Sequence, residues 1–401
     1  VYTQAASSAS HRKEATMLEQ TEITKDLLYP QRRYHTMCQT TPFALHPQTH
    51  SLQVFRYQDV QQILRDPQTF SSQLNFGRGM NDSLVNSDPP RHRQLRNLIT
   101  QQFTPRMIGL LETRITAIVH QMLDKVITAG HMDIVDDLAH PFPTTVISEL
   151  LGVPIEDSGQ FRVWSDTMME QVLSPAREQR LCTEMTTYFQ HVIEQRRREP
   201  ANDIISALLT VEIDGERLSE QELLSFCILL LVAGNETTTT LIGNAMVCFD
   251  TFPEAWQTLR EDPSLIPSAI EEVLRYYSPV NNIARIATVD TTLGDQTIKA
   301  GQHVIPMVAA ANLDESVFPQ ALTFDIRRNP NKHIAFGYGI HFCLGTPLTR
   351  LEAKIVFTAL VERLTDIRRV QDIPLEPIRD SGAQGIKHFP ITFKPGSPVL
   401  R

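Results

Sequence analysis

The chain has 401 residues, of which 41% are hydrophobic and 21% are charged, and its formal net charge is -9. This composition is ordinary for a globular protein, and the acidic balance speaks against a nucleic-acid partner. The 5 cysteines form no C-x-x-C pair, which argues against a zinc site and a disulfide framework and fits a reducing cytoplasm.

Residues 1–18 are rich in Ala, Ser and Thr and lack the apolar core of a secretion signal, so we predict a mobile tail there. No later stretch has the composition of a linker, and we predict one large domain over residues 19–401. The longest apolar run, 223–233, contains Ser225 and is far shorter than the roughly 20 residues that a membrane span needs. The protein is therefore predicted to be soluble and cytoplasmic, with no membrane partner.

Strand-like and helical patterns are mixed in the first third of the chain, as in Leu52–Tyr57 and Tyr57–Asp66. From Pro105 onward amphipathic helices dominate. We predict helices over 106–129, 142–151, 160–173, 178–198 and 219–249, and short strands over 288–293, 297–298 and 303–307. This order predicts a mainly α protein with a small β portion.

A basic helix face is predicted just after Asp88-Pro89-Pro90, where a proline start is followed by His92 and Arg96. Residues four apart lie on one face of a helix. Such a face is usually solvated, so the pattern alone assigns it no ligand.

The longest predicted helix begins at the capping box Ser219–Glu222 and continues to about Asp250, which makes it about 30 residues or ~45 Å long. Its centre, 233–240, holds a glycine, a glutamate and four threonines, which are poor helix formers. Threonine hydroxyls can bond to the carbonyl four residues earlier and bend the helix. Because the flanks are apolar, we predict that this polar centre is buried and has a function.

A glutamate and an arginine three apart, Glu272 and Arg275, can meet on the next predicted helix. By itself this spacing is typical of weak, solvated surface pairs. Arg285 follows in the stretch Asn281–Arg285, and Arg328 ends the stretch Phe324–Arg328.

A lone cysteine, Cys343, lies near the end of the segment Phe336–Gly345, with Gly337, Gly339 and Gly345 around it. Free cysteines are usually buried structural residues. A core cysteine, however, has no need of three glycines. A thiolate that must reach an iron needs neighbouring backbone without obstructing Cβ atoms, and peptide N–H groups aimed at the sulfur hold it as an anion. Cys343 is therefore our candidate haem ligand.

The segment Phe336–Gly345 fills every position of the pattern Phe-x-x-Gly-x-His-x-Cys-x-Gly, so the chain resembles the cytochrome P-450 family, with matching features from about Asp88 to Glu352. The resemblance implies the cytochrome P-450 fold, a single large domain with a long central helix over the cofactor haem b (iron protoporphyrin IX). It implies that the thiolate of Cys343 binds the iron. It places the cofactor contacts at His92, Arg96, Ala233, Gly234, Arg285, Phe336, Gly337, His341, Cys343 and Gly345.

The helix centre resembles the family's oxygen-activating motif, Ala/Gly-Gly-x-Asp/Glu-Thr. The resemblance gives Thr237 the role of a hydrogen-bond donor to dioxygen and Glu236 that of a proton source. It also implies a buried cluster of Glu272, Arg275 and Arg328 that supports the cysteine loop. Leu313 and Glu315 depart from the family's usual arginine and aspartate, at positions away from the chemistry.

The resemblance implies a monooxygenase that inserts one oxygen atom from O2 into a C–H bond of a medium-sized lipophile, such as a steroid, terpenoid, fatty acid or polyketide. It places substrate contacts at Leu229, Ala233, Val280, Ile283 and Ile386, with further contributions from 75–86 and 164–172. A peroxide-driven peroxygenase and a haem-based binder or sensor are the alternatives, and the acid and alcohol pair speaks against the sensor.

No segment of the sequence is typical of a flavin or iron–sulfur domain, so electrons are expected from NAD(P)H through a separate protein. We predict an acidic ferredoxin or flavodoxin that docks on basic residues of the cysteine side, and a monomeric enzyme. The docking residues are predicted to be Arg91, Arg93, Arg106, Arg350 and Lys354.

Overall fold

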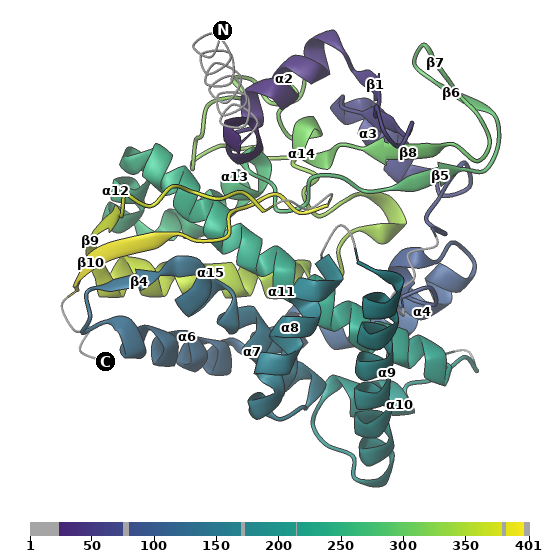
Figure 1. Ribbon diagram of the computed structural model, residues 1–401, viewed down its shortest axis with the longest axis horizontal. Helices are drawn as coiled ribbons and strands as arrows, with labels where there is room; N and C mark the ends of the chain where they lie inside the picture. Colours follow the sequence, from purple (N-terminus) through teal and green to yellow (C-terminus); the bar gives the residue numbers. More distant parts are fainter. Residues whose placement is uncertain (1–23, 75–79, 170–172, 214, 379–381, 397–401) are drawn as a thin grey trace, which may run out of the picture.

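The computed structural model describes residues 24–74, 80–169, 173–213, 215–378 and 382–396, and the predicted tail 1–18 lies outside them. Helices dominate the described chain, as predicted, and Figure 1 shows their arrangement. The α-helices are α2 Gln31–Thr40, α3 Tyr57–Arg65, α4 Arg91–Thr100, α5 Pro105–Gly109, α6 Glu112–Val126, α7 Pro141–Leu151, α8 Ser158–Met169, α9 Pro175–Arg198, α10 Ile204–Thr210, α11 Glu220–Thr251, α12 Pro253–Glu261, α13 Ile266–Tyr276, α14 Val308–Ala311 and α15 Thr346–Arg363. A π-helix, η3, covers Ile134–Ala139, and short 3-10 turns are η1 Leu84–Asn86, η2 Gln101–Phe103, η4 Ile155–Asp157, η5 Pro263–Leu265 and η6 Gly339–His341.

The strands form three small sheets at the periphery of the helices (Figure 1). They are β1 Phe43–Leu45, β2 Leu52–Val54, β3 Phe70–Ser71, β4 His131–Asp133, β5 Arg285–Ala287, β6 Thr291–Leu293, β7 Gln296–Ile298, β8 His303–Pro306, β9 Leu364–Arg369 and β10 Pro390–Pro395. The largest sheet has the order β1-β2-β8-β5-β3, in which only β2 and β8 are parallel. It carries β5, and with it Arg285, to the edge of the functional site.

Two predicted segments differ from the observed elements. The helix predicted over 106–129 is two helices, and the first ends at Gly109, a residue that favours helical backbone least after proline. The strand predicted over 288–293 begins only at Thr291, because Thr288 is turned to the sheet edge, where its amide and hydroxyl both donate to backbone carbonyls at Thr69 and Gln68.

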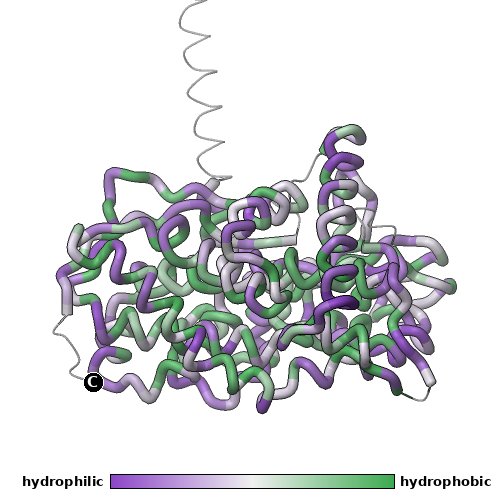
Figure 2. The backbone as a smooth tube through the Cα atoms, turned by 90° about the horizontal axis from the view of Figure 1, so that it is seen from below, coloured by the Kyte–Doolittle hydropathy of each residue, from purple (hydrophilic) through white to green (hydrophobic). Residues whose placement is uncertain are grey.

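The predicted central helix is confirmed as α11, and its N-terminus has the predicted capping box between Ser219 and Glu222. An 18-residue window of α11 is long and apolar enough to cross a membrane, but 72% of that window is buried inside the protein. The helix is therefore explained as the core helix of a globular domain. Figure 2 shows the same arrangement, with hydrophobic segments inside and hydrophilic ones at the outside.

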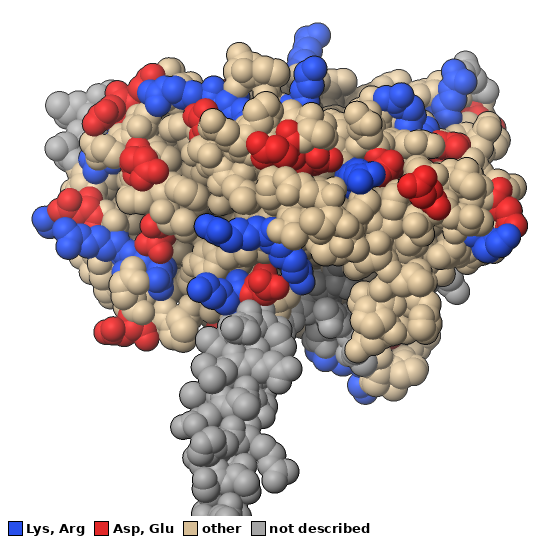
Figure 3. All heavy atoms as spheres, turned by 90° about the horizontal axis from the view of Figure 1, so that it is seen from above, with Lys and Arg blue, Asp and Glu red and all other residues tan. Residues whose placement is uncertain are grey.

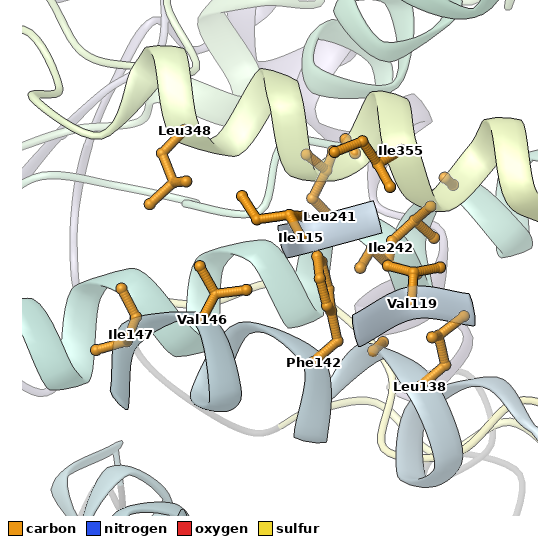
Figure 4. Packing of buried hydrophobic residues seen from close by; sticks show 14 of the residues in the cluster. Ile115, Val119, Leu138, Phe142, Val146, Ile147, Leu241, Ile242, Leu348 and Ile355 are labelled. Carbon is orange, nitrogen blue, oxygen red and sulfur yellow. The ribbon is translucent and has the colours of Figure 1, made fainter. Parts of the chain in front are cut away.

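Helices α6, α7 and α15 and the π-helix η3 meet α11 in the part of the main core that Figure 4 shows. Ile115 and Val119 of α6, Phe142 and Val146 of α7, Leu241 and Ile242 of α11, and Leu348 and Ile355 of α15 meet there. Because protein interiors are densely packed, this core fixes the distance between α11 and α15. The site lies in the space between these two helices.

Charged side chains of both signs are interspersed on the face shown in Figure 3. Among the described residues on this face, no continuous basic field of the kind that nucleic-acid binding requires is seen.

Candidate active site

A cavity of about 540 Å³ lies beside the middle of α11, and most of its wall is apolar. The elements that enclose it are α4, α11, the segment 279–285, the cysteine loop and the start of α15. Most of the predicted site residues line it, although they come from distant parts of the chain. These are Arg96, Leu229, Ala233, Gly234, Thr237, Val280, Ile283, Arg285, Phe336, Gly337, His341, Cys343 and Gly345.

The cysteine loop is held by backbone hydrogen bonds, from the Cys343 amide to the Phe336 carbonyl (2.8 Å) and from the Gly337 amide to the Ile334 carbonyl (2.8 Å). Gly337 and Gly339 have φ values of +74° and +73°, which side chains disfavour. A Cβ on Gly339 would also lie 2.5 Å from the carbonyl oxygen of Leu64. These two glycines thus shape the loop, whereas a Cβ on Gly345 would make only an ordinary contact of 3.8 Å with the Cys343 sulfur.

The sulfur of Cys343 faces the cavity, so its accessible area belongs to the cavity wall and not to the outer surface. Burial raises the pKa of this thiol, while N–H groups of Gly345 and Thr346, the Thr346 hydroxyl and the Arg96 charge act in the opposite direction. A sulfur surrounded by such donors is suited to bind a metal as the thiolate.

Four basic side chains gather at one end of the cavity. His341 accepts or donates one hydrogen bond with Ser72 Oγ (2.9 Å), and its ring lies 4.3 Å from that of His92. Burial and neighbouring positive charges lower the pKa of His341 to about 3 and that of His92 to about 4. Burial also lowers the pKa of Arg96, and that of Arg285 to about 10.

These groups test whether haem fits the cavity. Within the described ranges no carboxylate forms an ion pair with Arg96 or Arg285, and His92 Nε2 has no hydrogen-bond partner. Burying cations without counter-charges is unfavourable, so such a cluster is suited to an anionic ligand. Two carboxylates at this end and an iron at Cys343 satisfy the donor set, and haem carries both.

The polar centre of α11 distributes its side chains to different partners. The Thr237 hydroxyl lines the cavity and donates to the Ala233 carbonyl four residues earlier (2.9 Å), as predicted. The Thr239 hydroxyl donates instead to the Ala139 carbonyl of η3 (3.0 Å), and Asn235 accepts from Thr144 of α7 (2.8 Å). Glu236 is buried but is not part of the cavity wall.

A second carboxyl group, Glu352 of α15, was missed by the sequence analysis. It is 1% exposed, lines the cavity and accepts a hydrogen bond from Thr238 (3.1 Å), while its Oε1 has no partner among the described residues. Burial raises its pKa to about 8. The only sequence signal is a glutamate inside the apolar stretch of α15, and only packing against α11 makes it a site residue.

Two predicted contacts lie outside the cavity wall. His92 contacts the ring of His341 but does not line the cavity. Ile386 packs against Gly243 of α11, where a Cβ added to the glycine would lie 3.4 Å from the Ile386 side chain. Gly382 lines the cavity at the turn assigned to Ile386. Of the predicted substrate segments, residues 75–79 and 170–172 lie outside the described chain. Leu84 and Val85, which belong to the predicted segment 75–86, line the cavity. Apolar wall residues that the sequence did not indicate include Phe103, Ile147, Phe226 and Leu230.

The structure brings together the predicted supporting cluster. Arg275 donates twice to Glu272 (2.8 and 2.7 Å), and Arg328 donates to the same carboxylate (3.2 Å). The side chains of Glu272 and Arg275 are both 0% exposed. A buried carboxylate with this many donors fixes α13 against the loop that precedes the cysteine.

Three of the predicted docking cations are already paired. Arg91 makes a two-bond contact with Glu222 (2.6 Å each), Arg350 makes one with Glu271 (2.7 Å each), and Lys354 lies 3.4 Å from Glu112. Arg93 and Arg106 are exposed.

Comparisons with known proteins agree with this site. A family model described as cytochrome P450 matches residues 28–379. Cytochrome P450 109 of Bacillus spizizenii is 39% identical over 98% of this chain and 99% of that protein. The crystal structure of CYP109E1 from Bacillus megaterium in complex with testosterone is 38% identical, with a TM-score of 0.88 over 92% of this chain and 99% of that one. That of CYP109Q5 from Chondromyces apiculatus is 40% identical, with a TM-score of 0.86 over 93% and 97%.

Proposed function

Since the chain belongs to the cytochrome P450 family and is a haem-dependent monooxygenase, we propose that the cavity beside α11 holds the haem, with Cys343 as the ligand of its iron. The observation that carries this assignment is a cysteine sulfur, surrounded by N–H donors, in the same cavity as buried basic groups that lack carboxylate partners. Bound in this cavity, haem would supply the iron chemistry that activates dioxygen, one atom of which enters the substrate.

The residues of the chain hold and orient this cofactor. Arg96, Arg285 and His341 bind its carboxylates, and His92 supports His341 from behind through their ring contact. The N–H groups of Gly345 and Thr346 oppose the effect of burial, which raises the pKa of Cys343, and bonding to the iron would hold the sulfur as the thiolate. Gly234 and Ala233 leave room beside α11. We assign haem b, iron protoporphyrin IX, whose two carboxylates match these basic groups.

Proton handling is assigned to three residues near the middle of α11. The Thr237 hydroxyl lies on the cavity wall and donates to the Ala233 carbonyl, and releasing that bond would free its proton for a ligand in the cavity. Glu236 is assigned the delivery of protons to this point. Glu352 is the third, because its raised pKa of about 8 keeps a proton on a carboxyl group of the cavity wall at neutral pH. Thr238, which bonds to Glu352, is the residue next to Thr237.

The substrate is proposed to be a medium-sized lipophile of the steroid type, with terpenoids, fatty acids and polyketides as the wider class. Leu229, Ala233, Val280 and Ile283 provide an apolar wall for it, to which Phe226 adds an aromatic ring. The similarity to a protein crystallised with testosterone favours steroids within this class.

Electrons are proposed to come from NAD(P)H through a ferredoxin or flavodoxin that docks on the cysteine side, with the enzyme acting as a cytoplasmic monomer. Because Arg91, Arg350 and Lys354 are paired with carboxylates, the exposed Arg93 and Arg106 are proposed to contribute most to docking.

The spectrum of the reduced, carbon monoxide-bound protein tests the ligand assignment. A thiolate ligand moves the Soret band far to the red, whereas an imidazole ligand does not. Wild-type protein is expected to show the shifted band, and Cys343→His is expected to lose it completely while still binding haem. A variant that keeps the band would refute the assignment. NADH consumption with a ferredoxin system, compared with turnover by peroxide, separates a monooxygenase from a peroxygenase.

A further inference from the structure

Glu271 of α13 connects three elements around the cysteine loop. Its carboxylate accepts two hydrogen bonds from Arg350 of α15, Nε to Oε1 and Nη2 to Oε2, each 2.7 Å long. His333, in the segment that leads to the cysteine loop, makes a third contact through Nε2 (3.0 Å). The neighbouring Glu272 faces a different cluster, so Glu271 is not part of the supporting ion pairs described above.

The contact with Glu271 places the Arg350 guanidinium against Phe336. Its central carbon lies 5.0 Å from the centroid of the Phe336 ring, and the His333 ring is 6.0 Å from the same ring. The Phe336 ring in turn meets Phe342 edge-on at 6.3 Å, and the Phe336 carbonyl accepts the amide of Cys343 (2.8 Å). A continuous set of contacts therefore runs from Glu271 to the residue that carries the sulfur.

The charges of Glu271 and Arg350 are fixed at working pH. Burial would raise the pKa of Glu271, but the hydrogen bonds from His333 and Arg350 outweigh it and hold the pKa at about 2. Hydrogen bonding to Glu271 raises the pKa of Arg350, and the charge of Cys343 adds to this. An ion pair with two parallel hydrogen bonds restricts the guanidinium to one orientation.

We propose that Glu271 is a positioning residue: it holds Arg350 on the Phe336 ring and thereby sets the electrostatic environment of the Cys343 sulfur. This inference rests on the proposed role of Cys343 as the iron ligand. It assigns Arg350 to the cofactor side of the molecule, in place of the partner-docking role predicted from sequence. Glu271 acts through Arg350, and it touches neither the cofactor nor the substrate.

The midpoint potential of the haem in four proteins tests this inference: wild type, Glu271→Gln, Arg350→Ala and the double variant. Removing the Glu271 carboxylate leaves the Arg350 charge uncompensated and mobile, so Glu271→Gln is expected to raise the potential, while Arg350→Ala lowers it. If Glu271 acts through Arg350, the double variant has the potential of Arg350→Ala. Additive shifts would overturn the proposal, as they would show Glu271 acting only as a distant charge.

Glu149→Gln is a matched control, because Glu149 of α7 forms a similar two-bond pair with Arg114 of α6, and neither residue lines the cavity. Its side chain and that of Arg114 are 30% and 52% exposed, compared with 26% and 45% for Glu271 and Arg350. Both Gln variants are expected to lower the unfolding midpoint, but only Glu271→Gln moves the potential. Equal, unchanged potentials in the two variants would reduce Glu271 to a structural residue.

Should Glu271→Gln not retain haem, Arg350→Ala decides alone: an unchanged potential and an unchanged carbon monoxide band in that variant overturn the proposal. Failure of the underlying function has a different signature. If wild-type protein itself lacks the red-shifted band, the assignment of Cys343 is wrong, whatever Glu271 does.

Discussion

Replacing Glu352 by glutamine probes the buried carboxyl group between α11 and α15. The amide keeps the size of the side chain and can still accept the hydrogen bond from Thr238, but it cannot ionise. Burial raises the pKa of Glu352 from 4.5 to about 8 in the folded protein. The variant therefore removes one specific dependence of stability on pH.

The direction in which stability changes with pH follows from how many protons the folded and the unfolded protein bind. Below the unfolded pKa of 4.5 the carboxyl is protonated in both states, so its contribution to stability is constant. As the pH rises from 4.5 to about 8, the unfolded chain releases a proton that the folded protein keeps, which favours unfolding increasingly. Each pH unit in this window costs wild-type protein about 1.4 kcal/mol, or on the order of 5 kcal/mol over the whole window, and the amide variant loses nothing.

Urea unfolding of the haem-loaded proteins at pH 5.5, 6.5 and 7.5, followed by circular dichroism, measures this difference. The free energy of unfolding of Glu352→Gln, minus that of wild type, is expected to grow by about 1.4 kcal/mol per pH unit. Glu149→Gln is the control: it removes a partly exposed carboxylate that pairs with Arg114 and does not line the cavity, so its difference from wild type is expected not to grow in this way. A constant difference for Glu352→Gln as well would refute the buried, protonated carboxyl.

Three further predictions concern the cavity and its partner. Thr237→Ala is expected to lower the product formed per NADH by on the order of 10²-fold, with the missing electrons recovered as peroxide, because the hydroxyl on the cavity wall is lost. The control is Thr239→Ala, whose hydroxyl donates to Ala139 away from the cavity, and it should keep the wild-type yield of product per NADH. Equal yields in the two variants would remove Thr237 from the mechanism. Ala233→Leu places a larger side chain on the cavity wall and should weaken steroid binding by about tenfold or more. The affinity is measured from the low-spin to high-spin change of the iron, and an unchanged affinity would show that the substrate lies elsewhere. Joint replacement of Arg93 and Arg106 by alanine should slow electron delivery about tenfold at low salt and have little effect at high salt, so a loss independent of salt would argue against docking there.

The residues around Cys343 were identified from sequence because their chemistry depends on short-range order. A cysteine, three glycines and a histidine all lie within ten positions, and the structure places Gly337 and Gly339 in a left-handed conformation that favours glycine. The central helix was equally predictable, since a capping box and an apolar pattern are local properties of the chain.

Tertiary packing alone decided the roles of Glu352 and Arg350. Glu352 becomes a buried carboxyl only because α15 packs against α11, and Arg350 becomes a partner of Phe336 only because Glu271 approaches from α13. Their nearest neighbours in sequence give no sign of these contacts. The identity of a side chain states which bonds it can form, but burial and the approach of distant elements determine which charges are compensated, and therefore which residues act on the site.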